Sequence, residues 1–325
     1  MKSVDFLDGK ALLVTDTELH QTLFDEVRER WNHYTHDAFP GPQPVSIERV
    51  HLDSLRNNYR VCEKSDGQRF LFVCSRYQGK PYCFVMNRKK DMYVLRFEIV
   101  TEAFKGTILD GEIILNKHTN RHEFLVYDST MVCGRNTMDK THEVRMTEAL
   151  SVVQFIKTYP DSVFTVRLKS FYPFERFSWF VENVVPTLCY DIDGYVFTPN
   201  DDPVISGTHY RMFKWKEQHK NTVDFLIEPN HNKRSVHKYI LKILKGKYLK
   251  VLFDNHVLVE PGHAVETAVL HEKKSVVVEC EYIGPNTWKA IMIRHDKTTP
   301  NSYMTWTKTL LNIEENIQLK EFFEP

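Results

Sequence analysis

The stretch Glu63–Arg69, which reads E-K-S-D-G-Q-R, decides how the rest of the sequence is interpreted. The residues before it end in Tyr59–Cys62 and those after it begin with Phe70–Val73, and both runs are rich in β-branched and aromatic side chains. This composition predicts two strands joined by a polar turn. Gly67 has no Cβ, so the backbone could come close to a ligand there. The stretch therefore predicts either a hairpin turn with solvated charges or an active site.

Lys64 is the candidate nucleophile of this stretch. A lysine amine attacks a phosphorus atom only when it is unprotonated, and burial or a neighbouring cation favours that form. One neighbouring charge at about 4 Å, with an effective dielectric constant near 20, is worth roughly 4 kcal/mol, which would suffice near neutral pH. Arg69, another lysine or a bound metal ion could supply this charge, and the same cations would stabilise the phosphates of a nucleotide.

The composition is that of a neutral chain with room for two domains. The 43 basic and 43 acidic residues among 325 cancel, so any attraction to nucleic acid must be local. The six cysteines are scattered without a CxxC pair and no signal peptide is visible, which predicts free thiols in a reducing compartment. No apolar run approaches the roughly 18 residues that span a bilayer. We therefore expect a soluble intracellular protein that does not bind membranes.

Helical and strand patterns alternate over the first part of the chain. Capping-box spacing at Thr15 and Glu18 begins a helix that must end before the proline-rich residues Phe39–Pro44. Strand patterns follow up to Asp128. Helical patterns then cover Glu143–Thr158 and Phe174–Val185, and strand patterns resume at Tyr195–Phe197 and Met212–Phe213. This order predicts an α+β fold with antiparallel sheets and flanking helices, not a doubly wound parallel sheet.

The C-terminal part has a different pattern, which begins after the polar residues Glu217–Asn221. Short strand patterns cover residues 223–227, 248–253, 256–259, 275–282 and 288–294, and five such strands suit a small barrel such as the oligonucleotide-binding (OB) fold. A last helical pattern covers Asn312–Phe323. We predict a first domain over residues 1–219, an OB domain over 220–307, and a C-terminal helical segment, 308–325, that packs back on the first domain.

A basic segment, Lys233–Lys250, holds seven lysines and arginines and no acidic residue. Such a local field would suit an RNA backbone. The alternative is the solvated face of an amphipathic helix through Val236, Ile240 and Leu244.

Carboxylates and lysines recur beside the predicted strands. Asp110-Gly111-Glu112 follows an apolar run, and Asp193-Gly194 precedes another. Carboxylates at strand ends can hold a hard cation while a neighbouring glycine lets a phosphate approach, although each pair alone also suits a turn. In Lys214-Trp215-Lys216, alternation along a strand would place both lysines on one face.

In this order the motifs resemble the covalent nucleotidyltransferases, namely mRNA capping guanylyltransferases and ATP-dependent polynucleotide ligases. They are K-x-D-G-x-R at Lys64, D-G-E at Asp110, Phe124–Asp128, D-G-Y-V-F at Asp193, K-W-K at Lys214, and R-x-D-K at Arg294. The resemblance covers nearly the whole chain. Residues 41–49 and 308–317 are similar to the compact capping enzymes of large DNA viruses of the chlorella-virus type, which favours capping over ligation and implies a viral protein.

The resemblance implies a two-step reaction. Lys64 would take GMP from GTP and release pyrophosphate, and GMP would then pass to the 5′-diphosphate end of RNA. Lys214 and Lys216 would contact the α-phosphate. Four residues of the barrel would orient the β- and γ-phosphates when the domains close: Asp224, Arg294, Asp296 and Lys297.

The same resemblance assigns the rest of the nucleotide site. Arg69 would touch the ribose or the RNA end, Arg88 the sugar, and Glu112 the ribose or a metal ion, Mg²⁺ or Mn²⁺, held mainly by Asp193. The remaining residues would bind guanine: Tyr127 and Val196 would sandwich the base, and Lys169 would donate to its O6. Tyr127 stands where phenylalanine is frequent, so its hydroxyl needs a partner if it is buried.

Two alternatives remain open at the level of sequence. An ATP-dependent RNA or DNA ligase would use the same lysine, and Lys169 is the local argument for guanine. A non-catalytic RNA-binding scaffold would have no need of the lysines and carboxylates together. Because two domains use the whole length, we expect a separate RNA triphosphatase and a separate cap methyltransferase.

Overall fold

The computed structural model describes residues 1–325 except 32–38, 253–255, 296 and 324–325. Contacts between Cα atoms divide the chain into two units. The larger unit comprises Met1–Val45 and Asp53–Trp215, and the C-terminal unit comprises Ser46–Leu52 and Lys216–Pro325. Each unit is described by itself.

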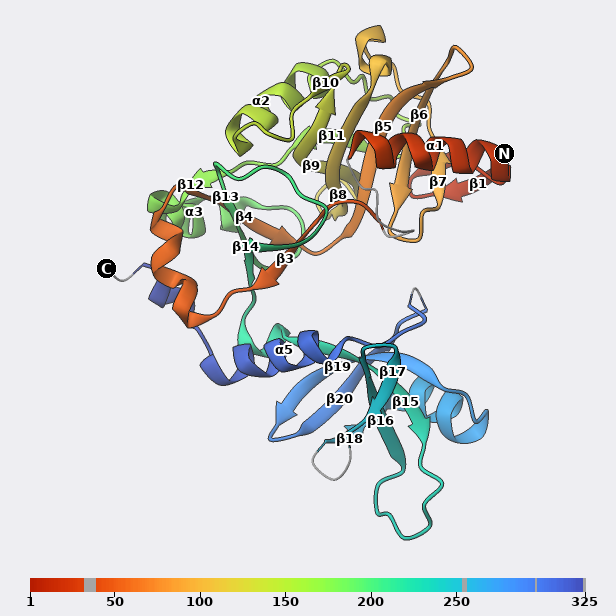
Figure 1. The fold of residues 1–325 in the computed structure, drawn as a ribbon, viewed down its shortest axis with the longest axis vertical. Helices are drawn as coiled ribbons and strands as arrows, with labels where there is room; N and C mark the ends of the chain where they lie inside the picture. The colour runs from red at the N-terminus through yellow and green to blue at the C-terminus, as the bar shows by residue number, and fades with distance from the viewer. Residues whose placement is uncertain (32–38, 253–255, 296, 324–325) are drawn as a thin grey trace. The chain divides into compact units, whose positions relative to one another are not determined.

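The larger unit contains a nine-stranded sheet, mostly antiparallel (Figure 1). Its main order is β1-β2-β7-β6-β5-β8-β9-β10, and β11 pairs with β9 in parallel. The strands are β1 (Lys2–Phe6), β2 (Gly9–Leu13), β5 (Gln68–Tyr77), β6 (Lys80–Asn87), β7 (Met92–Val94), β8 (Thr107–Asn116), β9 (Arg121–Val132), β10 (Arg135–Asn136) and β11 (Thr165–Leu168). β5 and β6 pair as a hairpin that turns at Gln78 and Gly79.

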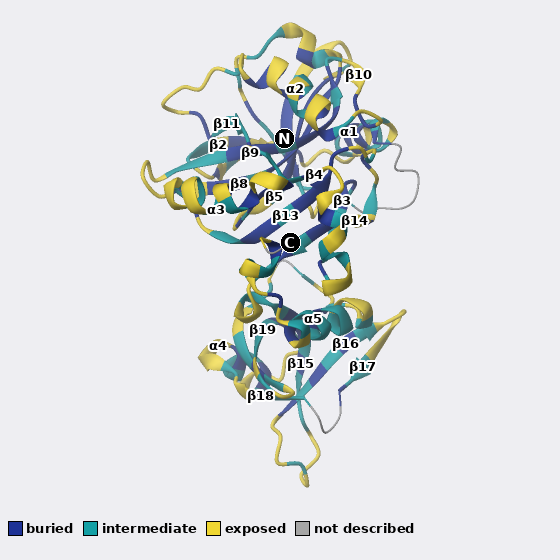
Figure 2. Ribbon diagram, turned by 90° about the vertical axis from the view of Figure 1, so that its left-hand side faces the viewer, coloured by how far each residue is buried: buried dark blue, intermediate teal, exposed yellow. Residues whose placement is uncertain are grey.

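A second sheet of five strands completes the larger unit, in the order β12-β4-β13-β14-β3. The strands are β3 (Pro42–Ser46), β4 (Tyr59–Ser65), β12 (Tyr172–Pro173), β13 (Ile192–Pro199) and β14 (Gly207–Trp215). Buried residues predominate along β4, β5, β8 and β13, as the dark blue ribbon in Figure 2 shows. The apolar side chains of these strands fill the space between the sheets and the helices.

The chain crosses from one sheet to the other at Asp66 and Gly67. β4 pairs with β13 in the five-stranded sheet, whereas β5 pairs with β6 and β8 in the nine-stranded sheet. The hairpin interpretation of Glu63–Arg69 is therefore wrong, although both strands exist. A Cβ at Gly67 would lie 2.3 Å from the Ile113 carbonyl oxygen, so only glycine fits this crossing without a backbone shift.

Helices flank the sheets of the larger unit. α1 (Thr17–Arg30) begins at Asp16, whose Oδ1 accepts from the Leu19 amide at 2.8 Å, one residue after the predicted cap. α2 (His142–Val153) and α3 (Phe177–Asn183) match the other two helical predictions, with earlier ends. Short 3₁₀ helices cover Arg49–Arg56, Thr101–Lys105, Phe174–Arg176 and Val185–Thr187. The predicted α+β class with antiparallel sheets is confirmed.

The C-terminal unit is built on six strands in the order β17-β16-β15-β19-β20-β18. They are β15 (Thr222–Pro229), β16 (Tyr239–Lys245), β17 (Tyr248–Val251), β18 (Val257–Glu260), β19 (Val276–Gly284) and β20 (Thr287–Ile293). The two ends of this order, β17 and β18, are consecutive along the chain, and β18 pairs with β20 in parallel. Among the described residues these pairings form an open antiparallel sheet with one parallel pair, and no pairing closes it into a barrel. The mixed architecture with antiparallel strands is as predicted, and the closed OB barrel stays a prediction.

The remaining helices belong to the C-terminal unit. They are a 3₁₀ turn over Gln218–Lys220, α4 (Gly262–Glu266), a π turn over Thr267–His271, α5 (Tyr303–Glu315) and a 3₁₀ turn over Leu319–Phe322. α5 begins nine residues before the predicted Asn312, with Ser302 as its cap. Its side chains Tyr303, Trp306 and Leu310 pack on the barrel core, and the contact division assigns the tail to this unit together with Ser46–Leu52. The domain limits 1–219, 220–307 and 308–325 stay predictions.

The segment Ser46–Leu52 is fastened to this tail by polar contacts. Arg49 pairs with Glu321, and its Nη2 donates to the Glu315 carbonyl oxygen at 2.8 Å. Lys308 Nζ donates to Glu48 Oε1 at 3.1 Å. These contacts explain why a segment early in the sequence groups with the C-terminal unit.

Two general expectations concern the whole chain. All six cysteines are free thiols. Within the described residues, no helix has both the length and the apolar composition needed to cross a membrane.

Candidate active site

Lys64 lies near the end of β4, where its ammonium contacts a carboxylate of the neighbouring strand. Its Nζ is 2.9 Å from Oδ1 of Asp193 and 3.1 Å from Oδ2. The two side chains are 24% and 18% exposed, so the pair is accessible from one side only. The predicted nucleophile and the predicted metal ligand are therefore held together before any nucleotide binds.

Strand register places further predicted residues on the same side of this sheet. Lys64 is opposite Gly194, and Val196 is opposite both Cys62 and Lys214. Directly opposed residues, and residues two apart on a strand, share a face. Lys64, Val196 and Lys214 therefore line one face. Gly194, with φ of 146°, places no side chain opposite the lysine.

Lys216 lies just beyond this strand. β14 ends at Trp215, and the division between the units falls between Trp215 and Lys216. The prediction that both lysines of Lys214-Trp215-Lys216 lie on one strand is therefore wrong by one residue.

Glu112 of β8 lies next to this site from the other sheet. Ser65 Oγ donates to its Oε2 at 3.1 Å. Burial raises the pKa of Glu112, while the charges of Lys169 and Lys64 and the Ser65 hydrogen bond oppose that shift and the Asp193 charge adds to it. Glu112, Lys64 and Asp193 thus interact electrostatically across the two sheets of the larger unit.

Lys169, which follows β11, is buried and contacts two residues of β4. Its Nζ donates to Ser65 Oγ at 2.7 Å and lies 3.3 Å from Glu63 Oε1. Burial alone would lower the pKa of Lys169, but the neighbouring Cys62, Glu63 and Glu112 groups outweigh it, and the pKa is raised. Lys169 is therefore a fixed cation deep in the site, with its side chain 3% exposed.

Arg69 is fixed in the wall of the site. Its Nε donates to Asp110 Oδ1 at 2.9 Å and its Nη2 to Oδ2 at 2.5 Å, while its Nη1 donates to the Pro42 carbonyl at 2.7 Å. Tyr127 also donates its hydroxyl to Asp110 Oδ1, at 2.8 Å. The predicted need of Tyr127 for a hydrogen-bond partner is confirmed. Asp110 thus orients the arginine and the tyrosine together.

Arg88 is exposed after β6, and its Nη2 donates to Gln43 Oε1 at 3.4 Å. This weak neutral contact leaves the guanidinium at the surface of the larger unit. Arg88 therefore differs from Arg69, which is 8% exposed and paired with a buried carboxylate.

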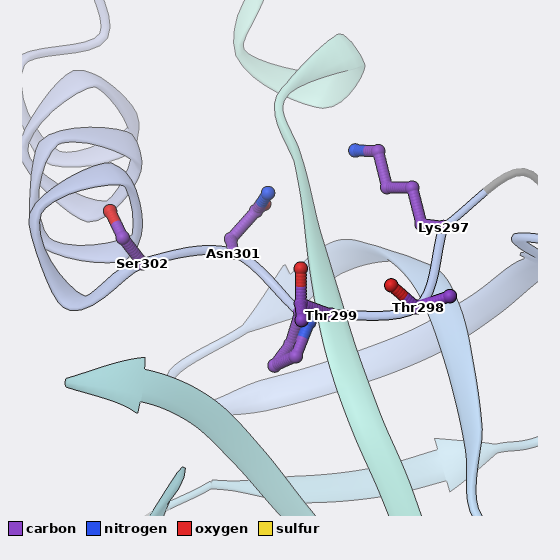
Figure 3. Close-up of a pocket in the computed structure, with 6 residues that line it drawn as sticks. Lys297, Thr298, Thr299, Asn301 and Ser302 are labelled. Atoms are coloured by element: carbon purple, nitrogen blue, oxygen red, sulfur yellow. The ribbon is translucent and has the colours of Figure 1, made fainter. Parts of the chain in front are cut away.

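Three predicted residues of the C-terminal unit form a second cluster around Asp224, which is 5% exposed. Arg294 Nη1 lies 3.2 Å from Asp224 Oδ1 and 3.2 Å from Glu279 Oε2, and Lys297 also pairs with Asp224. Asn301 Nδ2 donates to Asp224 Oδ2 at 3.3 Å. Lys297–Ser302 line an open pocket beside this cluster (Figure 3). Asp296 lies outside the described residues.

The geometry indicates a different role for Asp224 from the predicted one. A carboxylate repels phosphates, so a direct role in orienting them is not supported by its position. Asp224 instead holds two cations, Arg294 and Lys297, beside the open pocket.

Several residues that matter in this geometry received no role from sequence. Glu63, Ser65 and Asp110 hold Lys169, Glu112 and Arg69 respectively. All three are buried polar residues inside otherwise apolar strand patterns, and such residues need partners. That signal could have identified them, because Glu63 and Ser65 flank Lys64 and Asp110 precedes Gly111-Glu112.

Asp193 and Glu112 are also suited to a divalent ion. They offer carboxylate oxygens, the ligands that Mg²⁺ and Mn²⁺ prefer, and the charge of Asp193 reaches Glu112. In the described part of the chain, no group of three or more histidines, cysteines and carboxylates is arranged to hold a metal. The chemistry of the two side chains, two carboxylates that interact electrostatically, is what makes them candidates for holding a divalent ion.

Comparison with known families covers both units. Residues 13–218 match the family described as mRNA capping enzyme, catalytic domain, and residues 220–323 match the family described as mRNA capping enzyme, C-terminal domain.

Curated relatives from fungi and an animal have the same description. The mRNA-capping enzyme subunit alpha of Schizosaccharomyces pombe is 27% identical over 320 residues, covering 89% of this chain and 80% of the relative. The mRNA-capping enzyme of Caenorhabditis elegans is 26% identical, covering 92% of this chain and 51% of the relative. Among solved structures, a mycobacterial DNA ligase D complexed with ATP and MES is 14% identical with a TM-score of 0.40, covering 79% of this chain and 95% of that one.

Proposed function

The chain belongs to the mRNA capping enzyme family, and we propose that Lys64 of its larger unit is the residue that receives GMP. The enzyme is an mRNA guanylyltransferase that uses GTP and RNA. The observation that supports the site is the contact between Lys64 and Asp193, next to Glu112, on a sheet whose register puts Lys64, Val196 and Lys214 on one face.

In the first step, Lys64 Nζ attacks the α-phosphorus of GTP. A P–N bond forms, the bond between the α-phosphorus and the bridging oxygen breaks, and pyrophosphate leaves. Lys214, on the same sheet face, would stabilise the charge that develops on the α-phosphate, and Lys216 would assist it. Arg294 and Lys297 of the C-terminal unit, both held by Asp224, would bind the β- and γ-phosphates; Asp296 would act beside them.

In the second step, a β-phosphate oxygen of 5′-diphosphate RNA attacks the phosphorus of the lysine-bound GMP. The P–N bond breaks, Lys64 recovers a proton, and the RNA receives a GpppN cap. No oxidant or further co-substrate is needed, because each step exchanges one bond at phosphorus for another.

Lys64 attacks phosphorus only as the unprotonated amine, and its Nζ contacts the Asp193 carboxylate. Asp193 and Glu112 would hold a divalent ion, Mg²⁺ or Mn²⁺, which would supply positive charge beside the α-phosphate. Ser65 supports this arrangement, since its hydroxyl orients Glu112.

Recognition of guanine is assigned to Lys169, Tyr127 and Val196. Lys169 has three N–H donors, of which Ser65 Oγ and Glu63 account for two directions. Guanine O6 would take the remaining one, and adenine has no acceptor there. Tyr127, fixed by Asp110, and Val196 would contact the faces of the base, while Arg69 and Arg88 would line the sugar side.

The test of the function is incubation of the purified chain with α-labelled GTP or ATP and Mg²⁺ or Mn²⁺, followed by denaturing electrophoresis. Labelling by GTP and not ATP supports the proposal. Labelling by ATP alone would indicate the ligase reaction, and no labelling by either nucleotide would favour the RNA-binding scaffold.

Partners and source are proposed on less direct grounds. A separate RNA triphosphatase would supply the 5′-diphosphate end and a separate methyltransferase would modify the cap. The name subunit alpha of the Schizosaccharomyces pombe relative fits work alongside another subunit. A viral source stays a prediction of the motif resemblance, since the relatives described above are fungal and animal.

A further inference from the structure

The basic segment Lys233–Lys250 of the C-terminal unit has no role in the reaction described so far. Its structure excludes the amphipathic helix considered from sequence, because residues 239–245 form β16 and residues 248–251 form β17. Figure 1 shows β16 running from the loop over 230–238 to the β16–β17 turn. At about 3.3 Å per residue, β16 alone spans roughly 23 Å, which is long enough to follow several nucleotides.

The positive charge of this segment is largely uncompensated. Lys242 pairs with Glu228 at 2.6 Å. Among the described residues, no carboxylate lies within ion-pair distance of the other six: Lys233, Arg234, Lys238, Lys245, Lys247 and Lys250. Five of these six side chains are exposed, the exception being the half-buried Lys250. The protein as a whole is neutral, so this segment is a local site of attraction for a polyanion.

Aromatic rings accompany these charges at the β16–β17 turn. Tyr248 is directly opposite Lys245 across the hairpin and is 80% exposed. The Nζ atoms of Lys245 and Lys250 lie 5.3 Å and 4.6 Å from the centre of the Tyr303 ring, which itself packs on the barrel core. Tyr303 thus orients two ammonium groups by cation–π contact, and Tyr248 offers a ring on which an unpaired base can stack.

Backbone hydrogen bonds connect this turn to the Asp224 cluster of the same unit. The Leu244 amide donates to the Asn301 carbonyl at 2.9 Å, and the Asn301 amide donates to the Asp224 carbonyl at 2.8 Å. Tyr303 follows Asn301 by two residues. Two backbone hydrogen bonds through Asn301 therefore link β16, next to the basic turn, to β15, which carries Asp224.

We propose that the basic segment, with Tyr248 at its turn, binds the single-stranded body of the RNA whose 5′-diphosphate end is capped. This inference rests on the proposed function for the identity of the RNA. Exposed lysines would follow the backbone, and Tyr248 would stack on a base, a combination that suits single strands better than duplexes. An OB fold usually covers about 4–16 nucleotides, so an RNA of 20 nucleotides is long enough to occupy the segment.

The test uses the full chain and a fluorescent 5′-hydroxyl RNA of 20 nucleotides, which cannot accept GMP. Anisotropy titrations at 50–200 mM salt compare the parent with K245A/K247A/K250A. We expect about tenfold weaker binding and a slope of log affinity against log salt that is smaller by about 2, since each lost phosphate contact on a single strand removes roughly 0.7. Tyr248→Ala should weaken binding by about tenfold without changing the slope.

Two further variants separate binding from folding and from net charge. The triple variant could disturb the fold, because Lys245 and Lys250 contact Tyr303. K238E/K247E changes two exposed lysines that do not make this contact, and it must weaken RNA binding as well. K273A/K274A/K289A removes the same charge as the triple variant from other parts of the unit and should bind RNA like the parent. The inference would be overturned if K245A/K247A/K250A and K238E/K247E both bound RNA like the parent. It would also be overturned if the control K273A/K274A/K289A lost as much RNA affinity as they do.

Capping assays distinguish this inference from the proposed function. The two lysine variants of the basic segment, K245A/K247A/K250A and K238E/K247E, should form lysine–GMP from GTP like the parent. Their KM in the capping reaction should rise about tenfold for a 5′-diphosphate RNA of 20 nucleotides but not for a 5′-diphosphate dinucleotide. An absence of lysine–GMP in the parent would refute the function while leaving the anisotropy result to be judged by itself. If the hairpin variants lose an acidic phosphopeptide but not RNA, the surface serves a protein partner and the inference is wrong.

Discussion

The two units hold their site cations in different ways. In the larger unit each cation has a carboxylate of its own: Lys64 has Asp193, Lys169 has Glu63, and Arg69 has Asp110. In the C-terminal unit Arg294 and Lys297 share Asp224, and Arg294 also contacts Glu279. Both regions are therefore close to charge balance, but Arg69 and Lys169 are only 8% and 3% exposed, whereas Arg294 and Lys297 are 21% and 33% exposed.

The two arrangements suit different tasks, namely fixing the geometry around the nucleophile and binding an anion. A balanced, buried set of pairs fixes geometry around the lysine nucleophile, because breaking any pair leaves a buried charge without a partner. Cations that are paired but partly exposed stay accessible to an anion from solvent. The comparison predicts that substitutions in the two regions have different consequences for chemistry and for stability.

The largest expected effect is on the nucleophile of the larger unit. Lys64→Ala should lower lysine–GMP formation by at least roughly 10⁴-fold, because no other group can form the P–N bond. Covalent labelling with α-labelled GTP measures it. Lys117→Ala is the matched control, since Lys117 is exposed and also pairs with an aspartate, Asp191, at 2.6 Å; it should label like the parent. Labelling of the Lys64 variant at the parental rate would contradict the assignment.

A second prediction compares the stability of the two kinds of carboxylate. Asp110→Asn should destabilise β8 by about 3–5 kcal/mol, because it leaves Arg69, 8% exposed, without its buried partner. Asp224→Asn should cost only about 1–3 kcal/mol in β15, because Arg294 and Lys297 are 21% and 33% exposed and can be solvated. Hydrogen exchange of the two strands measures the local free energies. Equal losses would remove the proposed distinction.

The third prediction concerns Arg294, one of the two partly exposed cations of the C-terminal cluster. Arg294→Ala should lower the rate of lysine–GMP formation by about 10²-fold, since one cation on the leaving phosphates is lost. Single-turnover labelling at saturating GTP measures the rate. Lys274→Ala, a lysine of the same unit paired with Glu272 at 2.7 Å, should leave it unchanged. A full rate in the Arg294 variant would mean that this cluster does not act on the nucleotide.

The smallest effect concerns Glu112, whose pKa is raised chiefly by burial. A carboxyl group with a raised folded-state pKa stabilises the fold at low pH, and this contribution is lost as the pH rises through that pKa. Glu112→Gln should therefore raise Tm slightly at pH 7 and leave it unchanged near pH 4, while its activity with Mg²⁺ or Mn²⁺ falls. Thermal unfolding at the two pH values measures this. A variant less stable than the parent at pH 7 would show that the charged form is favoured instead.

Much of the fold follows from the sequence because its signals are local. Alternation predicted β5, β6 and most strands of the C-terminal unit, capping-box spacing placed the start of α1, and helical spacing of apolar residues predicted α2. The sequence failed where partners are distant: β4 and β5 look like a hairpin but join different sheets, and β16 resembles a helix because its buried residues and lysines alternate only over a short range.

The candidate site shows the same limit. Motif order identified Lys64, Asp193 and Lys214 as a set, and register indeed puts Lys64 and Lys214 on one face. The roles of Glu63 and Asp110 could not be predicted, because each depends on a partner far away in the sequence, Lys169 and Arg69. The role of Asp224 in holding Arg294 and Lys297, instead of orienting phosphates, also could not be predicted without knowing which residues surround it.

Mapping the site of GMP attachment tests the central claim most directly. The chain is incubated with GTP and Mg²⁺ or Mn²⁺, digested with protease at alkaline pH, and its peptides are sequenced by mass spectrometry. We predict one acid-labile GMP on Lys64 Nζ. GMP on any other residue, or a modified peptide that persists in Lys64→Ala, would contradict the account.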